Sequence, residues 1–490
     1  MTTCSDLFQG LECTIIGNGA DEVPGLAYRS DAVKPGDLFF CIVGLKVDGH
    51  SFAQDAIDRG AKFIVVERKL YLAATDDVTL IVVKDSRKAM AHVAARFYGN
   101  PSADFALVGV TGTNGKTTTT YLTEQIARAA GKRTGVIGTV GIEIAGEIEK
   151  AERTTPESPD LQRTFARMRD ANVDVVAMEV SSHSLDLLRT WHTDFAVTAF
   201  SNLTQDHLDY HHTFEAYFEA KALLFSADYP AKRVICIDDK WGKELLRRCA
   251  KAEDWVITTG FDPSAQIHPV SVEYFNDHTA VELDVRGRRK SFEYPLVGRF
   301  NVENIMCAYG IGMALGIPQD MIMSALSQAP QVPGRLERVK ANDGGVSVFV
   351  DYAHTPDALA KAISSIKALS QGRTIVVFGC GGDRDSTKRS IMGRTSLDAD
   401  FAVVTSDNPR SENPLAIIED ILSGMGEGKG RYEVVPDRRE AIARAIALAQ
   451  PGDSILIAGK GHEDYQIVGD KVLSFDDRKV AAEELDRKNA

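Results

Sequence analysis

The sequence predicts an α/β protein of three domains: a small N-terminal α/β domain, a central P-loop domain with a mostly parallel sheet, and a C-terminal Rossmann-like α/β domain. Three observations lead to this prediction. A chain of 490 residues is long enough for about three domains. Short apolar runs alternate with helix-like stretches, which is typical of parallel sheets. Turn-forming clusters at residues 99–102 and 331–335 divide the chain into residues 1–101, 102–333 and 334–490.

Composition limits the classes of function. The formal net charge of −13 argues against a general nucleic-acid or membrane-surface binder. No apolar run reaches membrane-spanning length, and residues 1–7 lack the basic and apolar regions of a signal peptide. The seven cysteines are scattered without a Cys-x-x-Cys pair, which favours reduced thiols over a zinc site or a disulfide framework. We therefore expect a cytoplasmic protein.

The first domain alternates apolar runs with helical stretches. Ser51 is a candidate N-cap for a helix that ends near Gly60. Ser30 and the loop of residues 44–50 are polar positions near strand ends, and the residues alone assign them no chemistry. The predicted strands are residues 37–43, 62–66 and 78–83, and a further helix should end at residue 98.

The strongest local signal is a glycine loop between an apolar strand and a helix. Residues 106–110 suit a buried parallel strand, and the sequence Thr111-Gly-Thr-Asn-Gly-Lys-Thr117 follows it, before a helix expected from about residue 121. Glycines let backbone N–H groups approach an anion, the helix N-terminus adds positive potential, Lys116 neutralises charge, and the hydroxyl of Thr117 can bind Mg2+. We favour an ATP phosphate site over a simple Gly/Thr-rich connection, although the usual spacing needs glycine where Val110 stands.

Other polar residues of the central domain fit this interpretation. Residues 173–180 form an apolar run that ends in Glu179, where a P-loop fold places an acidic Mg2+ ligand, although a strand-end glutamate is often simply solvated. His207 and His211 are four residues apart and could form a zinc pair on one helix face. No third ligand is evident, so we favour a histidine beside phosphates and Mg2+. Lys221 lies in a strongly helical stretch, where most lysines are solvated.

A β-rich stretch over residues 254–296 and a helix that ends at Gly316 precede the last domain. There, strands alternate with helices, which predicts a parallel sheet with right-handed crossovers and ligands at the carboxyl ends of the strands. The glycines after Phe378 do not spell Gly-x-Gly-x-x-Gly, so a nicotinamide or flavin site is not favoured. The predicted strands are residues 346–350, 373–378, 401–405, 432–435 and 454–458, and the loops after them contain residues 351–356, 379–385, 407–410 and 459–464.

Five motifs, taken together and in order, resemble those of the Mur ligases, the ATP-dependent amide-forming enzymes of peptidoglycan precursor synthesis. The resemblance covers essentially the whole chain. It implies a UDP-binding domain at residues 1–101, an ATP-binding ligase domain at residues 102–333 and an amino-acid-binding domain at residues 334–490. The motifs are Thr111-Gly-Thr-Asn-Gly-Lys-Thr117, Met178-Glu-Val-Ser-Ser-His183, Asn202-Leu-x-x-Asp-His-Leu-Asp-Tyr-His211, Phe300-Asn-Val-x-Asn304 and Asp351-Tyr-Ala-His-x-Pro356.

Within this family, the chain resembles the ligase that adds the third residue to UDP-N-acetylmuramoyl-L-alanyl-D-glutamate. In that group, the sequence Asp407-Asn-Pro-Arg410 goes with meso-2,6-diaminopimelate rather than lysine as the added amino acid. The same ligase adding L-lysine, and a non-catalytic nucleotide-binding protein, remain alternatives. A folate-polyglutamate ligase shares the middle domain, but the presence of residues 1–101 argues against it. The resemblance also implies a monomer without nucleic-acid or membrane partners.

The resemblance implies a reaction with ATP and Mg2+ as cofactors. The glutamate carboxylate attacks the γ-phosphate of ATP to form an acyl phosphate, and the amine then displaces phosphate. Because both partners are anions, charge neutralisation is the main task. The implied catalytic residues are Lys116, on the phosphates, and His207 and Lys221. Thr117 and Glu179 would hold one Mg2+, and His207 with a carbamate on Lys221 (N6-carboxylysine) would hold a second.

The resemblance assigns the remaining binding residues by motif. A planar guanidinium pairs with a carboxylate through two parallel hydrogen bonds, which suits Arg384 and Arg410 for diaminopimelate. The chain departs from the family at Arg153, often asparagine, at Leu187, sometimes glutamine, and at residues 45–47. The nucleotide site comprises Gly112, Thr113, Asn114, Gly115, Lys116, Thr117, Thr118, Asn301 or Asn304 at the adenine, Arg335 at the phosphates and Asp351 at the ribose. The UDP-dipeptide site comprises Ser30, Leu45, Lys46, Val47, Thr154, Thr155, Ser181 and Arg189. The diaminopimelate site comprises Arg384, Asp407, Asn408, Pro409, Arg410, Gly459 and Glu463.

Overall fold

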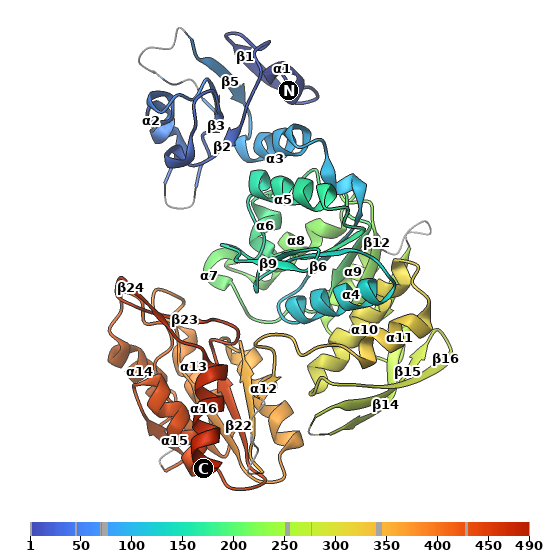
Figure 1. The fold of residues 1–490 in the computed structure, drawn as a ribbon, viewed down its shortest axis with the longest axis vertical. Coiled ribbons are helices and arrows are strands. Elements are labelled where there is room, and N and C mark those ends of the chain that lie inside the picture. Colours follow the sequence, from blue (N-terminus) through green and yellow to red (C-terminus); the bar gives the residue numbers. More distant parts are fainter. Residues whose placement is uncertain are drawn as a thin grey trace. The chain divides into compact units, whose positions relative to one another are not determined.

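Figure 1 shows the computed structural model, which describes residues 2–44, 47–68, 70, 77–249, 255–275, 277–339, 345–426 and 430–489. The chain folds into two compact units. Within the described residues, no helix is long and apolar enough to cross a membrane. The first unit contains residues 1–111, 131–198 and 219–233, and the second contains residues 112–130, 199–218 and 234–490.

The first unit begins with a five-stranded sheet of strand order β1-β5-β4-β3-β2, in which only β1 runs antiparallel to its neighbour. The run Phe63-Ile-Val-Val66 is buried throughout, because α1 and α3 cover one face of the sheet and α2 covers the other. The predicted Ser51 cap is wrong: Oδ1 of Asp48 accepts the N–H of His50 and caps an earlier 3₁₀ turn, and α2 starts after Phe52. The elements are α1 (Cys4–Leu7), β1 (Cys13–Ile16), β2 (Leu26–Ala27), η1 (Ser30–Ala32), β3 (Leu38–Phe40), η2 (Gly49–Phe52), α2 (Ala53–Asp58), β4 (Phe63–Val66), β5 (Thr79–Val83), α3 (Ser86–Phe97) and η3 (Pro101–Asp104).

A second sheet of the first unit places β10 between β6 and β7, all parallel, with the β8–β9 hairpin at its edge. The N–H of Ala196 donates to the carbonyl of Leu107, and the N–H of Lys232 donates to the carbonyl of Ala196. These two bonds add the starts of β11 and β12 to the sheet. The register pairs Glu179 with Val110, so the acidic strand end lies beside the strand that precedes the glycine loop. The elements are β6 (Ala106–Thr111), β7 (Thr134–Ile137), β8 (Ile142–Ile144), β9 (Glu147–Glu149), α5 (Ser158–Asp170), β10 (Val175–Glu179), α6 (Ser182–Asp186), β11 (Val197–Phe200), η4 (Leu223–Phe225) and β12 (Lys232–Cys236).

The second unit contains the helix that follows the glycine loop. This helix, α4, starts at Lys116 rather than near residue 121 and packs against α10, where a Cβ at Gly312 would lie 3.2 Å from Ile126. The predicted β-rich stretch is a group of four strands, with β13 parallel to β14 and β14, β15 and β16 antiparallel. The elements are α4 (Lys116–Ala129), α7 (Leu208–His211), α8 (Phe214–Ala222), α9 (Lys240–Cys249), β13 (Val256–Thr259), β14 (Ile267–Tyr274), β15 (Thr279–Val285), β16 (Arg288–Tyr294), α10 (Arg299–Ala314) and α11 (Gln319–Ser327).

The rest of the second unit is a doubly wound sheet with strand order β17-β18-β22-β19-β20-β21, parallel except for β17. Helices α12, α13 and α14 cover one face and α15 and α16 the other, so its strands are apolar on both sides. Loops at the carboxyl ends of β18, β19, β20 and β22 therefore share one edge. The elements are β17 (Glu337–Arg338), β18 (Ser347–Asp351), α12 (Pro356–Leu369), β19 (Thr374–Phe378), α13 (Lys388–Ser396), β20 (Phe401–Val404), α14 (Pro414–Leu422), β21 (Tyr432–Val434), α15 (Arg438–Leu448), β22 (Ser454–Ala458), β23 (Tyr465–Val468), β24 (Lys471–Ser474) and α16 (Asp477–Asn489).

Candidate active site

The glycine loop holds the ammonium of Lys116 at a helix N-terminus. Lys116 Nζ donates to the carbonyls of Gly112 and Thr113, at 2.9 and 2.8 Å. Gly115 ends the loop with φ +86°, and a Cβ there would lie 2.2 Å from Oδ1 of Asn304 on α10. Only glycine fits this combination of backbone and space. The loop therefore combines a fixed cation with the positive end of α4, which attracts anions.

The segment after β11 and the start of α12 brace the same loop. The backbone N–H of Asn114 donates to Oδ1 of Asn202, and its side-chain amide donates to Thr204 and to Asp357, at 3.2 and 3.0 Å. Thr204 also donates to Asp357 at 2.9 Å. Sequence reasoning assigned no role to Asp357, because an acid in the first turn of a helix is ordinary.

Arg335 joins the predicted nucleotide residues from two parts of the second unit. Its Nη2 donates to Oγ1 of Thr117 at 2.9 Å, and its guanidinium lies 4.8 Å from the centre of the Tyr352 ring. Asp351 accepts the N–H of Leu336 at 2.7 Å. Burial raises the pKa of Asp351 to about 6, although the charge of Arg335 opposes the rise.

Asn301 and Asn304 are both buried and bonded to each other. The amide of Asn304 donates to Oδ1 of Asn301 at 3.0 Å, and the amide of Asn301 donates to the carbonyl of Val297 at 2.8 Å. With Asn304 against Gly115, this pair supports the glycine loop. Contact of either residue with adenine stays a prediction.

His207 lies beside Asp206 just before α7. Its backbone has φ +53°, and its Nε2 lies 3.4 Å from Oδ2 of Asp206. Burial alone would raise the pKa of Asp206, but its electrostatic interactions with His207, His354 and Lys116 lower that pKa. His211 lies inside α7, so the two histidines do not share a helix as the zinc alternative requires. In the described part of the chain, no group of three or more His, Cys, Asp or Glu side chains could hold a metal ion.

In the first unit, Glu179 is buried and its carboxylate is bound by one threonine. Thr139 donates its N–H to Oε1 at 2.7 Å and its hydroxyl to Oε2 at 3.2 Å. The Thr139 hydroxyl also lies 3.0 Å from that of Thr154. The predicted metal ligand Glu179 and the predicted substrate residue Thr154 therefore belong to one network.

Three further predicted substrate residues meet in the same unit. The hydroxyl of Thr155 donates to the carbonyl of Glu179 at 2.9 Å and accepts the N–H of Ser181 at 3.2 Å. Arg189 donates from Nη1 to the carbonyl of Thr155 at 3.1 Å. Ser30 is separate from this group and hydrogen-bonds to Asp55, and Val47 is exposed. Leu45 and Lys46 lie outside the described residues.

Three arginines form ion pairs with Glu157, and the sequence analysis did not group these residues. Its Oε1 lies 2.9 Å from Nη2 of Arg189 and 3.2 Å from Nη1 of Arg153, and its Oε2 lies 3.6 Å from Nη1 of Arg87. The three ion pairs leave a net charge of +2, and Nη1 of Arg87 and Nε of Arg189 are buried without a hydrogen-bond partner. Such an arginine cluster is suited to an anion. Arg153 and Glu157 are four residues apart, but Arg87 and Arg189 come from distant stretches of the chain, so no sequence spacing indicates the whole cluster.

Lys221 is buried rather than solvated, with a relative exposure of 1%. A charged ammonium is costly at such a position unless it is compensated. No sequence signal indicates this burial, because Ala and Leu neighbours surround many exposed helix lysines.

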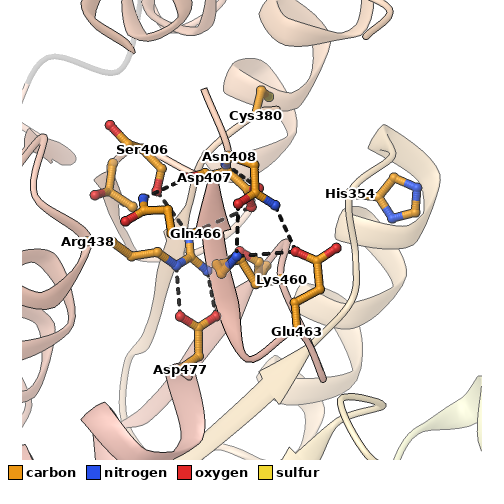
Figure 2. A network of polar contacts seen from close by, with 12 residues as sticks. His354, Cys380, Ser406, Asp407, Asn408, Arg438, Lys460, Glu463, Gln466 and Asp477 are labelled. Carbon is orange, nitrogen blue, oxygen red and sulfur yellow. Dashed lines mark hydrogen bonds and ion pairs between the residues drawn. The ribbon is translucent and has the colours of Figure 1, made fainter. Parts of the chain in front are cut away.

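The predicted amino-acid residues lie on loops at the carboxyl edge of the C-terminal sheet, and Figure 2 shows three of them, Asp407, Asn408 and Glu463. Arg410, at φ +52°, donates from Nη1 to the carbonyl of Gly382 at 2.7 Å. The exposed Arg384 lies on that facing loop and donates to the carbonyl of Asp383 at 3.1 Å. Gly459 has φ +117°, and a Cβ there would lie 2.6 Å from Oδ2 of Asp407.

Asn408 and Glu463 contact each other in this network. The amide Nδ2 of Asn408 donates to Oε2 of Glu463 at 2.8 Å, and both contact Lys460. Pro409 is buried behind them. Sequence reasoning assigned no role to Lys460, although a lysine between two glycines at the end of a buried strand was visible as a signal.

A buried ion pair joins the strand ends beneath these loops. Arg438 donates from Nε and Nη2 to the two carboxylate oxygens of Asp477, at 2.8 and 2.7 Å, and both side chains are fully buried. Arg438 Nη2 also donates to the carbonyl of Ala458 at 3.0 Å, and Nη1 to that of Ser406 at 3.4 Å. One guanidinium therefore connects the ends of β20 and β22 to the start of α16.

Comparison with known proteins gave three family matches in series. Residues 22–98 match "Mur ligase family, catalytic domain", residues 110–312 match "Mur ligase middle domain", and residues 334–461 match "Mur ligase, glutamate ligase domain". Together these segments cover most of the chain.

Individual relatives match over nearly their full length. A protein of Geobacillus thermodenitrificans named UDP-N-acetylmuramoyl-L-alanyl-D-glutamate--2,6-diaminopimelate ligase is 46% identical over 471 residues, which cover 94% of this chain and 95% of that protein. A Clostridium botulinum protein of the same name is 42% identical over 97% of this chain and 98% of its own. A solved structure of an enzyme of that name is 30% identical, with a TM-score of 0.72, and the match covers 100% of this chain and 99% of that one.

We predict that Arg438→Ala lowers the free energy of unfolding by about 3–5 kcal/mol, because it leaves Asp477 charged and buried without a partner. The matched control is Arg439→Ala, which removes a half-exposed pair with Glu483 at the next position and should cost about 1 kcal/mol or less. Urea unfolding of the full chain measures both. Equal losses in the two variants would contradict the role given to Arg438.

Proposed function

Because this chain belongs to the Mur ligase family, we propose that it is an ATP-dependent ligase that adds meso-2,6-diaminopimelate to UDP-N-acetylmuramoyl-L-alanyl-D-glutamate through an acyl phosphate. The printed names of near-full-length relatives support this substrate pair. The observation that carries the proposal is the grouping of Arg384, Arg410, Asn408 and Glu463 at one sheet edge. Residues 1–101, 102–333 and 334–490 would bind UDP, ATP and the amino acid, respectively.

The nucleotide site would work by charge compensation. Lys116 and Arg335 direct two cations at the N-terminus of α4, through contacts with the glycine loop and with Thr117. ATP phosphates bound there would replace the loop carbonyls as partners of Lys116. Neutralising the γ-phosphate lets a carboxylate, which is also an anion, approach it.

The expected donors fit Mg2+ by their chemistry. A threonine hydroxyl and a carboxylate are hard oxygen ligands, which Mg2+ prefers. Glu179 is 1% exposed, and its carboxylate is held in place by Thr139, so it is oriented in advance. Bound Mg2+ would supply further neutralisation of phosphate charge. Thr117 and Glu179 would hold one Mg2+, and His207 with a carbamate on Lys221 would hold a second.

The diaminopimelate site would contact both amino-acid centres of the ligand at once. Guanidinium groups of Arg410 and Arg384 lie on facing loops and suit a carboxylate through paired hydrogen bonds. Glu463 suits the ammonium of the distal centre, which lysine also carries, whereas the carboxylate of that centre is absent from lysine. An arginine left unpaired by lysine would lower its binding.

The arginine cluster at Glu157 would bind an anionic part of the UDP-dipeptide. It includes Arg189 and adjoins Thr155, two residues that the family resemblance assigns to that substrate. Glu157 would hold the three arginines together, and the net positive charge would remain for a phosphate or carboxylate. Arg153, a departure from the family pattern, would then contribute to substrate binding.

Release of phosphate tests the proposed function directly. We expect the purified protein to release phosphate from ATP only when both the UDP-dipeptide and diaminopimelate are present. A non-catalytic nucleotide-binding protein would release none under any combination. Phosphate release with neither substrate would indicate a different ATPase.

We predict that Lys116→Ala lowers kcat by about a thousandfold or more while the protein remains folded, because a cation is lost where phosphate charge develops. The measurement is ligation rate beside the thermal unfolding midpoint. The control is Lys367→Ala, which removes an exposed lysine from α12. Near wild-type turnover by a folded Lys116 variant would rule out the phosphate-loop assignment.

We predict that Lys221→Ala is nearly inactive and that short carboxylic acids in the buffer partly restore its activity. The reason is that a carboxylate of the added acid can take the place of the carbamate. Mass spectrometry of the intact wild-type protein with added CO2 gives an independent readout. An unmodified Lys221 ammonium in a fully active enzyme would contradict the carbamate.

We predict that Arg410→Ala lowers kcat/KM for diaminopimelate by a hundredfold or more and changes residual lysine activity much less. An unpaired buried charge costs about 3–5 kcal/mol, which corresponds to at least that factor. Arg410→Lys should restore little, because an ammonium cannot form the paired hydrogen bonds. If Arg410→Ala lowered both activities equally, Arg410 would not be the selecting residue.

A further inference from the structure

Lys460 is a fully buried lysine at the centre of the C-terminal network. It follows Gly459 at the end of β22, and its side chain has 0% exposure (Figure 2). Its Nζ donates to Oδ1 of Asn408 and Oε2 of Glu463, both at 3.2 Å, and to the carbonyl of Tyr465. An ammonium has three N–H donors, and these three acceptors use all of them. Lys460 therefore has neither the exposure nor a free donor to bind a substrate itself.

Lys460 fixes the orientation of the Asn408 side chain. The amide oxygen of Asn408 accepts from Lys460 Nζ and from the backbone N–H of Ile467, at 3.2 and 2.9 Å. Because an ammonium only donates, the amide must turn its oxygen toward Lys460. The amide nitrogen then points to Glu463, at 2.8 Å from Oε2.

The same contacts leave one oxygen of Glu463 for a ligand. Both hydrogen bonds, from Asn408 and from Lys460, go to Oε2. Oε1 makes no hydrogen bond within the described residues, and the side chain is 14% exposed. Glu463 is thus held by one carboxylate oxygen and presents the other.

We propose that Lys460 is a positioning residue for amino-acid binding: it keeps Glu463 ionised and aimed, so that Oε1 accepts the ammonium of the distal centre of diaminopimelate. This inference rests on the proposed function, because that function supplies the ligand. Lys460 acts through Glu463 and Asn408 and does not touch the substrate.

The charges around Glu463 show what Lys460 does. Burial raises the pKa of Glu463, the nearby Asp407 raises it further, and Lys460 lowers it. Loss of the Lys460 charge must therefore raise this pKa further and reduce the ionised fraction near neutral pH. Higher pH then restores the ionised form. The charged and titratable groups that face Glu463 are Lys460, Arg438, Asp407, Tyr352 and Tyr465.

The test measures KM for diaminopimelate from about pH 6 to about pH 9, with saturating ATP and UDP-dipeptide. We expect Lys460→Met to raise KM about tenfold near neutral pH with a smaller change in kcat, and the ratio of variant to wild-type KM to fall as pH rises. Using this ratio cancels the titration of the amino acid itself. Lys460→Gln keeps an N–H donor without the charge, so it should show the same pH trend with a smaller rise. Lys471→Met, at an exposed position of β24, is the matched control and should match wild type.

A double-mutant cycle separates this role from a general structural one. Glu463→Gln already removes the charge that Lys460 maintains. Lys460→Met should therefore change KM by no more than about twofold in the Glu463→Gln background. If the double variant raised KM by the product of the two single effects, the proposal would be overturned.

The remaining outcomes are also decisive. If wild type ligates diaminopimelate while both Lys460 variants keep its KM and pH profile, the inference fails and the proposed function stands. If wild type does not ligate diaminopimelate, the proposed function fails and this inference with it. If circular dichroism shows that Lys460→Met does not fold, Lys460→Gln alone provides the test. A KM ratio to wild type that falls as pH rises supports the inference, and a ratio that does not change with pH contradicts it.

Discussion

The ion pair between Arg438 and Asp477 holds together the edge on which the amino-acid residues lie. Two hydrogen bonds tie the charges to each other, and further N–H groups of Arg438 reach carbonyls at the ends of β20 and β22. A buried charge without a partner is costly, so the pair forces these chain segments to stay together. Lys460 is a second buried cation at this edge, with Asn408 and Glu463 as its partners. Buried cations, rather than the sequences of the loops alone, thus hold in place the loops that carry Asn408 and Glu463.

The same constraint recurs at the other sites. Cations intended for substrate anions are held by the protein's own oxygens: Lys116 by loop carbonyls, Arg335 by Thr117, and three arginines by Glu157. Positive charge is therefore oriented before any substrate arrives, which lowers the reorganisation needed during phosphoryl transfer. A ligase that joins an anionic nucleotide, an anionic dipeptide and a dicarboxylic amino acid needs this compensation in each of its three sites.

Local sequence patterns were sufficient to predict the buried strands and the loops that carry the motifs. Residues 454–458 were predicted and found as β22, because an apolar run between turn signals has few other interpretations. The hairpin of β23 and β24 was missed, since its exposed strands lack the apolar run of a buried strand. The contacts of Lys460 with Asn408 and of Glu157 with Arg87 and Arg189 join distant segments, and single-sequence spacing carries no record of them. The prediction that Ser51 is an N-cap was wrong because Asp48, three residues earlier, caps the turn instead.

Competition between amino acids tests the central claim most directly. The purified protein would receive ATP, Mg2+, the UDP-dipeptide and equal concentrations of meso-2,6-diaminopimelate and L-lysine, and mass spectrometry would identify the UDP-tripeptide formed. The charge arrangement around Arg410 and Glu463 predicts a product that carries diaminopimelate almost exclusively. A product that carries lysine, or a mixture in equal amounts, would contradict it.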